Sequence, residues 1–289
     1  MRLVFATSFM PSVVCLALTL LVYSTLPYLR NVHGYYVMCY VACQFVSYFC
    51  HAIQAMTIDD INSPLCIPFG YFTLFTYLTS YCWVNVICFD IYWMLRYNNS
   101  INRNTSISVS TVMCHIYCWG FSIVWVCTGY LFQHSQHKTL LKLAPDIGYR
   151  SCWFFEYNGN GILIFYLIPS CVMLTVNLIL FFLITIHSSR IKSELNEFQQ
   201  TDSPKIEIFF VYKSEKLEMS IKLFLLMGIP YLLRTLQIIF RIHWIIFDFF
   251  RIINRLHGVL IFIIFVAKRK VILDLRNKFR GSMNQSEST

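Results

Sequence analysis

Charged residues are scarce in this sequence. They make up 13% of the 289 residues, whereas 57% of the residues are hydrophobic. A soluble globular domain has about 25% charged and about 45–50% apolar residues. A chain this apolar cannot cover its surface with polar groups in water, which excludes an ordinary soluble domain. In lipid, only helices and closed barrels satisfy all of their own backbone hydrogen bonds.

Sequence signatures of catalysis and of cofactor binding are also missing. The sequence contains no H-E-x-x-H motif, no G-x-S-x-G motif and no nucleotide-binding glycine loop. Its twelve cysteines include no paired C-x-x-C spacing of the zinc-binding kind. We therefore expect no enzyme, no metal and no cofactor. The net charge of +9 comes from residues between apolar runs rather than on one soluble face, so we expect no nucleic-acid partner.

Long apolar runs decide between the two membrane architectures. They are continuous and about 20 residues long, which is the length of a helix that crosses a hydrocarbon core of about 30 Å. The alternating segments of about ten residues that are typical of barrel strands do not occur. We predict an all-α membrane protein whose residues 1–280 form a seven-transmembrane helix bundle. The spans are expected at residues 4–24, 34–56, 66–95, 108–132, 162–187, 217–240 and 247–266.

A basic segment follows the last predicted span. Residues 268–279 carry Val271, Ile272, Leu275 and Phe279 at helical spacing. This pattern predicts an amphipathic helix that lies on the inner membrane surface. Residues 281–289 are predicted to form a disordered cytoplasmic tail.

The distribution of Lys and Arg predicts the orientation in the membrane. Fifteen of these residues lie on the side that holds the C-terminus, and five lie on the other side. The richer side is expected to be cytoplasmic, with the N-terminus extracellular and the chain in the plasma membrane. One alternative is that residues 1–24 are a signal peptide. Its removal would leave six spans and place the fifteen basic residues outside, against the charge rule.

Cys66 and Cys152 differ from the other ten cysteines, which lie within apolar spans. Cys66 lies at the outer end of the third predicted span, and Cys152 lies in the second outer loop. Both fall in the oxidising compartment in the predicted orientation. A disulfide between them would tie the loop to the top of the helix. The alternative interpretation is two unpaired buried thiols.

Ionisable residues within the spans are costly in lipid and usually functional. We predict an intramembrane polar network around an outer cavity. The alternative is that the basic members extend to the interface from a seventh helix that starts later than predicted. The candidates for this network are Asp90, Arg234, Arg251, Arg255 and His257.

Several motifs occur together in the order and spacing of one receptor family. They lie at residues 29–34 (Leu-Arg-Asn-Val-His-Gly), 83–90, 119–120 (Trp-Gly), 150–153 (Arg-Ser-Cys-Trp), 227–228, 256–262 and 268–271. Together they resemble the Methuselah-like receptors of insects, a family similar to the secretin and adhesion receptors. The resemblance covers nearly the whole chain. One difference is that His257-Gly258 stands where the family has Gln-Gly.

The resemblance implies a G-protein-coupled receptor that rearranges its helix bundle to engage a heterotrimeric G protein. It also implies an extracellular ligand, with a peptide among the candidates. We expect the chain to lack the large extracellular domain that such receptors carry before the first helix. The expected G-protein-facing residues on the inner surface are Arg30, Asn31, His33, Arg96, Arg190, Lys192, Lys268, Arg269 and Lys270.

Two other functions stay open at this point. A transporter or channel of similar span count would have broken helices and inverted internal repeats, and no repeat is visible in the sequence. A shortened receptor that reaches the membrane without signalling is the third interpretation.

Overall fold

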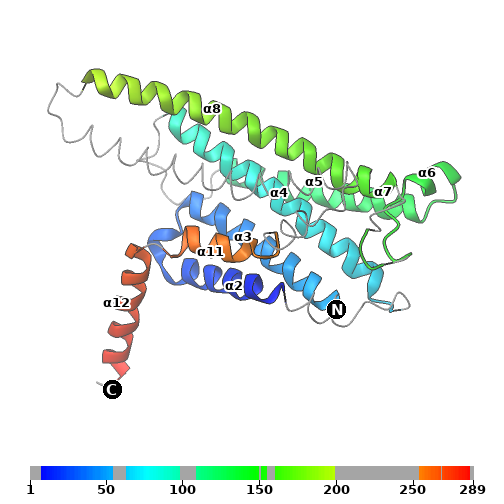
Figure 1. Ribbon diagram of the computed structural model, residues 1–289, viewed down its shortest axis with the longest axis horizontal. Coiled ribbons are helices and arrows are strands. Elements are labelled where there is room, and N and C mark those ends of the chain that lie inside the picture. The colour runs from blue at the N-terminus through cyan, green and yellow to red at the C-terminus, as the bar shows by residue number, and fades with distance from the viewer. Residues whose placement is uncertain are drawn as a thin grey trace, which may run out of the picture.

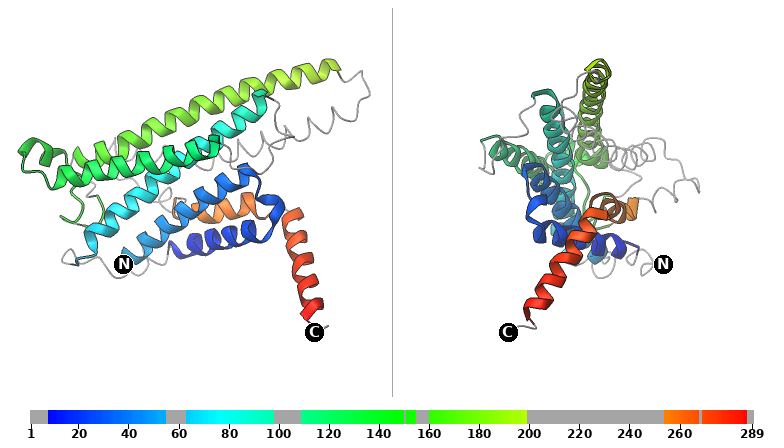
Figure 2. Two further views of the ribbon diagram at one scale, coloured as in Figure 1. Left: turned by 180° about the vertical axis from the view of Figure 1, so that it is seen from behind. Right: turned by 90° about the vertical axis from the view of Figure 1, so that its left-hand side faces the viewer.

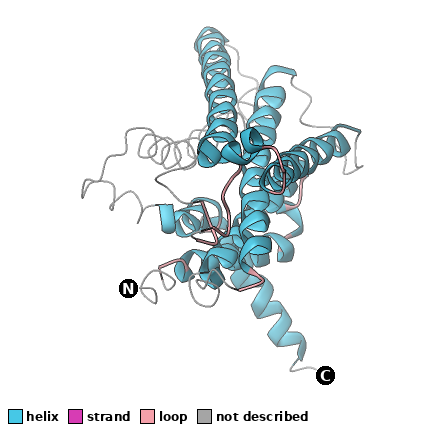
Figure 3. Cartoon of the chain, turned by 90° about the vertical axis from the view of Figure 1, so that its right-hand side faces the viewer, coloured by secondary structure: helices cyan, strands magenta, loops and turns pink. Residues whose placement is uncertain are grey.

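A computed structural model of the chain describes residues 8–54, 63–97, 109–149, 151–154, 160–198, 254–267 and 269–286. Within these ranges all regular structure is helical, as predicted (Figure 3). The helices are α2 (Met10–Thr25), η1 (Pro27–Leu29), α3 (Val32–Ile53), α4 (Cys66–Tyr97), α5 (Val109–Gln133), α6 (Lys138–Leu143), α7 (Asn160–Ile162), η4 (Leu163–Leu167), α8 (Ile168–Phe198), α11 (His257–Phe265) and α12 (Arg269–Ser286).

Four of the described helical segments are long and apolar enough to cross a membrane. They are Val32–Ile53, Cys66–Met94, Val109–Gln133 and Asn160–Ser189, and they coincide with four of the predicted spans. The apolar helix α2 is shorter, with 16 residues. The predicted span at 217–240 and the first part of the one at 247–266 lie outside the described residues.

Helix α4 occupies the centre of the helix bundle. It packs against α3, α5 and α8, while α2 and α11 pack against each other and α2 also packs against α3 (Figures 1 and 2). The Cys66–Cys152 disulfide lies at the end where α4 begins. We call this the disulfide end of the bundle. The opposite end, from which α12 leaves, is called the α12 end.

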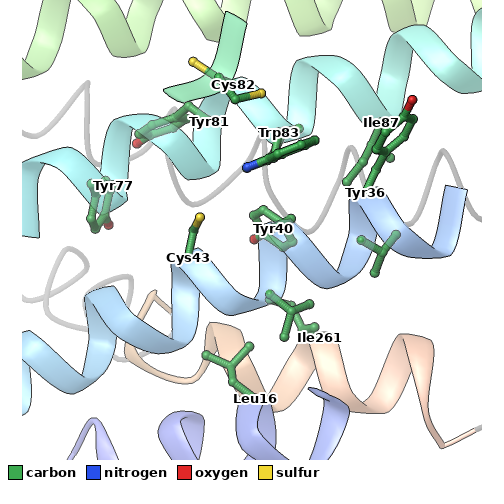
Figure 4. Close-up of a cluster of buried hydrophobic side chains, with 14 of the residues drawn as sticks. Leu16, Tyr36, Tyr40, Cys43, Tyr77, Tyr81, Cys82, Trp83, Ile87 and Ile261 are labelled. Carbon is green, nitrogen blue, oxygen red and sulfur yellow. The ribbon is translucent and has the colours of Figure 1, made fainter. Parts of the chain in front are cut away.

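Large side chains fill the contacts between these helices. Leu16 of α2, Tyr40 of α3, Trp83 of α4 and Ile261 of α11 are all fully buried. Figure 4 shows Tyr40 between Trp83 on one side and Leu16 and Ile261 on the other. Lipid is as apolar as these side chains, so close packing rather than escape from water holds the helices together.

The π-helical segment η4 has a local cause in the sequence. Pro169 follows it and has no backbone N–H to donate to the carbonyl four residues earlier, with which its ring would clash. The backbone widens just before the proline, and the N–H of Ile168 donates to the oxygen of Leu163, five residues earlier. Ser170 Oγ donates to the Tyr166 carbonyl at 2.6 Å. The predicted fifth span therefore crosses Pro169 without ending there.

The tight connection before α3 depends on two residues of the Leu-Arg-Asn-Val-His-Gly motif. Asn31 caps the helix, because its Oδ1 accepts a hydrogen bond of 2.7 Å from the Gly34 N–H. A Cβ atom at Gly34 would lie 1.7 Å from the Leu29 oxygen. Only glycine therefore fits where the chain of η1 approaches α3.

Two predicted helical segments end well before the helices do in the structure. The sequence predicts a disordered tail from residue 281, whereas α12 continues to Ser286. A single glycine such as Gly281 costs a helix only about 1 kcal/mol, which is not enough to end it. The fifth span was expected to end at His187, and α8 continues to Phe198. Polar residues end the apolar run there, but a helix also propagates through polar helix-forming residues.

Candidate functional site

Four buried polar side chains follow one face of α3. His33, Tyr40, Gln44 and Tyr48 are separated by seven, four and four positions. An α-helix has 3.6 residues per turn, so these spacings place the four on the same side of the helix. We call them the polar row. Each member of the polar row contacts a residue of another part of the bundle.

The first contact of the polar row lies at the α12 end. His33 Nδ1 lies 3.2 Å from Asp90 Oδ2, and the two side chains are 10% and 9% exposed. An ionised Asp90 accepts a hydrogen bond from the Nδ1–H group. A buried carboxylate needs such a partner because an unpaired charge is costly away from water. The structure thus brings together a residue predicted for the inner surface and one predicted for the intramembrane network.

The middle of the polar row joins three helices. The Tyr40 hydroxyl lies 3.0 Å from His257 Nε2 on α11. Gln44 Nε2 donates to the Tyr40 hydroxyl at 3.3 Å and to Ser80 Oγ on α4 at 3.4 Å. His257, a member of the predicted network, therefore contacts α3, and through it α4.

A turn interrupts the helix just before α11. Side chains of two other helices form hydrogen bonds with the backbone groups that the turn leaves without a helical partner. Ser12 Oγ donates to the Arg255 carbonyl and accepts a hydrogen bond of 3.1 Å from the Gly258 N–H. The Tyr48 hydroxyl donates to the Asn254 carbonyl at 2.5 Å. Lipid offers no hydrogen bonds to an interrupted helix, so a turn of this kind within a membrane would need such protein partners.

Helices α2 and α11 approach each other closely at Gly258. A Cβ atom there would lie 2.7 Å from the Ser12 carbonyl oxygen and 2.9 Å from Leu16 Cγ. Nearby, the guanidinium carbon of Arg255 lies 5.6 Å from the centre of the Phe9 ring, within range of a cation–π interaction. Arg255, predicted as part of the polar network, thus contacts α2 through its backbone and lies over the ring that precedes this helix.

The loop that contains Cys152 covers the disulfide end. The disulfide joins Cys66 to Cys152, the two cysteines for which the sequence predicts a bond. Gln54 Nε2 donates to the Cys152 carbonyl at 3.4 Å. The ring of Trp153 lies 5.0 Å from that of His51 on α3. The loop is thus attached to both α3 and α4.

Of the remaining predicted residues, Arg30, Asn31 and Arg96 are described with their side chains, and they lie outside these contacts. Arg30 and Arg96 are exposed at the α12 end, where Arg96 Nη1 donates to the Tyr92 hydroxyl at 2.5 Å. Asn31 caps α3, as described above. Arg190 and Lys192 belong to α8, and Arg269 and Lys270 belong to α12. Lys268, Arg234 and Arg251 lie outside the described residues.

In the contacts of the polar row and of the turn before α11, sequence reasoning missed five residues, because they are neutral and because single neutral polar groups are common in spans. The sequence did carry a partial signal, because three of the five recur at helical spacing on the face of α3 that His33 also occupies. The missed residues are Ser12, Tyr40, Gln44, Tyr48 and Ser80.

A comparison with known families assigns this set of helices. The family model described as "7 transmembrane receptor (Secretin family)" matches residues 2–261. The chain belongs to the secretin family of seven-transmembrane receptors. Membership of this receptor family agrees with the expectation that the chain is not an enzyme. It also makes the chain a multi-pass membrane protein, in keeping with its long apolar helices.

Relatives within the secretin family confirm the resemblance to Methuselah-like receptors. The chain is 27% identical to "G-protein coupled receptor Mth2" of Drosophila yakuba, over 99% of this chain and 54% of that protein. It is 28% identical to "Probable G-protein coupled receptor Mth-like 10" of Drosophila melanogaster, over 99% of this chain and 51% of the relative. The chain spans about half the length of these curated relatives.

Proposed function

We propose that residues 1–280 of this secretin-family receptor cross the plasma membrane seven times, with the N-terminus extracellular and the C-terminus cytoplasmic. Two features at opposite ends of the bundle support this orientation. The disulfide suits an oxidising extracellular compartment. The basic helix α12 lies at the other end, on the side to which the predicted spans assign fifteen of the Lys and Arg residues.

The chain then transmits an extracellular signal to a heterotrimeric G protein. The names of its relatives describe G-protein coupled receptors. The disulfide end, covered by the loop around Cys152 and Trp153, is where a ligand would approach from outside. The α12 end, with the exposed Arg30 and Arg96, would face the G protein. Such signalling is a shift between two packings of the bundle, which a ligand biases by binding one of them better.

The His33–Asp90 contact carries this proposal. It fastens α3 to α4 at the end that would face the G protein, and both side chains are nearly buried. A rearrangement that opens this end must break or move the contact. The same face of α3 also carries Tyr40, which contacts His257 of α11, and Tyr48, which donates to the Asn254 carbonyl just before α11. A displacement of α11 at the disulfide end therefore reaches His33 through one rigid helix.

The replacement of Asp90 by Asn tests the proposal. A hydrogen bond to a charged group contributes about 1.5–3 kcal/mol, so its loss shifts a two-state equilibrium by roughly 10- to 100-fold. We expect D90N to raise ligand-independent G-protein activation, measured with a dissociation sensor for each major G-protein class at matched surface expression. His33→Phe should have the same effect, and the double variant should add little, because both changes remove one contact.

The neighbouring Phe89 provides the matched control. It is 46% exposed on the outside of the same helix turn, so Phe89→Leu should leave signalling unchanged. If D90N and F89L behave alike at equal surface levels, the contact does not control the equilibrium.

A further inference from the structure

Two lysines lie on the short helix α6 at the disulfide end of the bundle (Figure 1). Lys138 and Lys142 are both exposed and four positions apart, so they share one face of the helix. The sequence has no acidic residue from position 91 to position 145, and neither lysine forms an ion pair within the part of the chain that the structure describes. Two exposed histidines precede them and add charge when they are protonated. We call this set the basic corner: His134, His137, Lys138 and Lys142.

Close packing on both sides fixes the backbone of the basic corner. Before it, the side chain of Gln133, the last residue of α5, donates from Nε2 to the Ile147 carbonyl at 2.7 Å. After it, the Ala144 carbonyl approaches Gly161 of α7 so closely that a Cβ atom at Gly161 would lie 2.0 Å from the oxygen. The two lysines therefore extend from a helix that is held at both of its ends, and their charges stay together.

An exposed aromatic ring follows the basic corner along the same loop. Tyr149 is 80% exposed and belongs to a tight turn. Asp146 and Gly148 in this turn have φ angles of 52° and 87°, and the Gly148 N–H donates to the Ser151 carbonyl at 2.9 Å. Tyr149 comes six positions after Leu143, the last residue of α6, so the two lie within about 20 Å of each other. The loop thus presents two charges and, a short distance away, a ring.

We propose that the basic corner and Tyr149 form a binding surface for a sulfated polysaccharide. Sulfate groups provide the counter-charge for the two lysines. A tyrosine offers sugar rings an apolar face together with a hydroxyl. A polysaccharide repeats its charges and rings along a chain and can cover both parts of the surface, whereas a lipid headgroup is a single small group. Access from outside the cell rests on the orientation proposed above, but binding itself depends on neither that orientation nor G-protein coupling.

The test uses the full chain in nanodiscs of phosphatidylcholine, a lipid without net charge. The probe is a heparin octasaccharide that carries a photoreactive group. Mass spectrometry of the digested receptor then locates and quantifies the cross-links. Because the readout is local, it separates the basic corner from the many basic residues at the α12 end, which a measurement of total heparin binding would include.

We expect cross-links within residues 134–154 of the wild-type chain. An exposed ion pair changes binding by up to about fivefold, so the K138Q/K142Q variant should lower the labelling of this segment by roughly 5- to 25-fold. The charge-conserving K138R/K142R variant should keep the labelling, and Tyr149→Ala should lower it. The matched control is R276Q/R280Q, which removes two exposed charges, also four positions apart, from α12 and should leave the labelling of residues 134–154 unchanged.

Three results would overturn the proposal. The K138Q/K142Q variant could be labelled within residues 134–154 as strongly as the wild type. The R276Q/R280Q variant could lose as much of this labelling as K138Q/K142Q does, which would indicate the net charge of the chain rather than the basic corner. Nanodiscs with phosphatidylserine could abolish the labelling, which would indicate that the basic corner binds lipid headgroups instead. Because the nanodiscs contain no G protein, failure of this test leaves the signalling proposal untouched.

Discussion

The replacement of Gly258 by alanine tests how closely α2 and α11 pack. The new Cβ would lie 2.7 Å from the Ser12 oxygen, 2.8 Å from Ser12 Cβ and 2.9 Å from Leu16 Cγ. The nearest of these atoms is a backbone oxygen, so no side-chain rotation relieves the contact and one helix must move. The movement also strains the hydrogen bond of 3.1 Å from the Gly258 N–H to Ser12 Oγ.

Overpacking of this kind costs about 1–3 kcal/mol, and alanine recovers about 0.5–1 kcal/mol of helix propensity. A net destabilisation of about 1–2 kcal/mol corresponds to a fall of roughly 2–8 °C in unfolding temperature for a chain of this size. The measurement is the thermal unfolding of detergent-purified receptor, followed by the loss of the monodisperse peak in size-exclusion chromatography.

Gly120 supplies the matched control for this experiment. It lies in α5, and a Cβ atom there would have no neighbour within 4 Å. Gly120→Ala should therefore be neutral or raise the unfolding temperature slightly, because only helix propensity changes. An unfolding temperature of Gly258→Ala at or above that of the wild type would refute the inferred close approach. A similar fall in both variants would show a general intolerance of alanine.

Three further predictions concern separate parts of the bundle. Tyr40→Phe removes the hydroxyl that contacts His257 and should lower the free energy of unfolding by about 1–3 kcal/mol, measured by the same thermal assay. Cys152→Ser removes the disulfide, whose two cysteines are separated by 86 positions. Chain entropy alone predicts a loss of about 4–5 kcal/mol in the free energy of unfolding, so surface expression should fall. Cys66→Ser should lower surface expression to the same extent. Partial burial raises the pKa of Asp146, so the folded chain loses stability as pH rises through the carboxylate range. Asp146→Asn should thus raise the unfolding temperature relative to wild type at pH 7, with the difference disappearing in acid; a difference that does not depend on pH would contradict this.

The helix positions follow closely from the sequence because the signal is local. The third predicted span, 66–95, begins at the same residue as α4 (Cys66–Tyr97), and the predicted 108–132 is displaced by one residue from α5 (Val109–Gln133). In both cases a continuous apolar run marks the stretch that lipid can accept. The predicted end of the fifth span falls short of the end of α8, because helical hydrogen bonds do not stop where hydropathy changes.

The candidate site was only partly predictable because its contacts join distant segments. The charged residue Asp90 and the histidine His257 stood out as costly groups in lipid. Their partners did not: His33 was assigned to the inner surface, and Tyr40 was not selected. Whether a buried polar group faces a partner depends on the rotation of each helix, which hydropathy does not reveal when a helix is apolar on all sides.

The sequence by itself determined that this chain is an all-helical membrane protein, because a chain so apolar needs lipid and lipid forces each backbone group to find its partner within a helix. The tertiary structure alone decided which polar groups meet. His33 and Asp90 are 57 positions apart, and Ser12 and Gly258 are 246 positions apart. Local physics sets the hydrogen bonds within a helix, but contacts between helices depend on how the finished helices pack against one another.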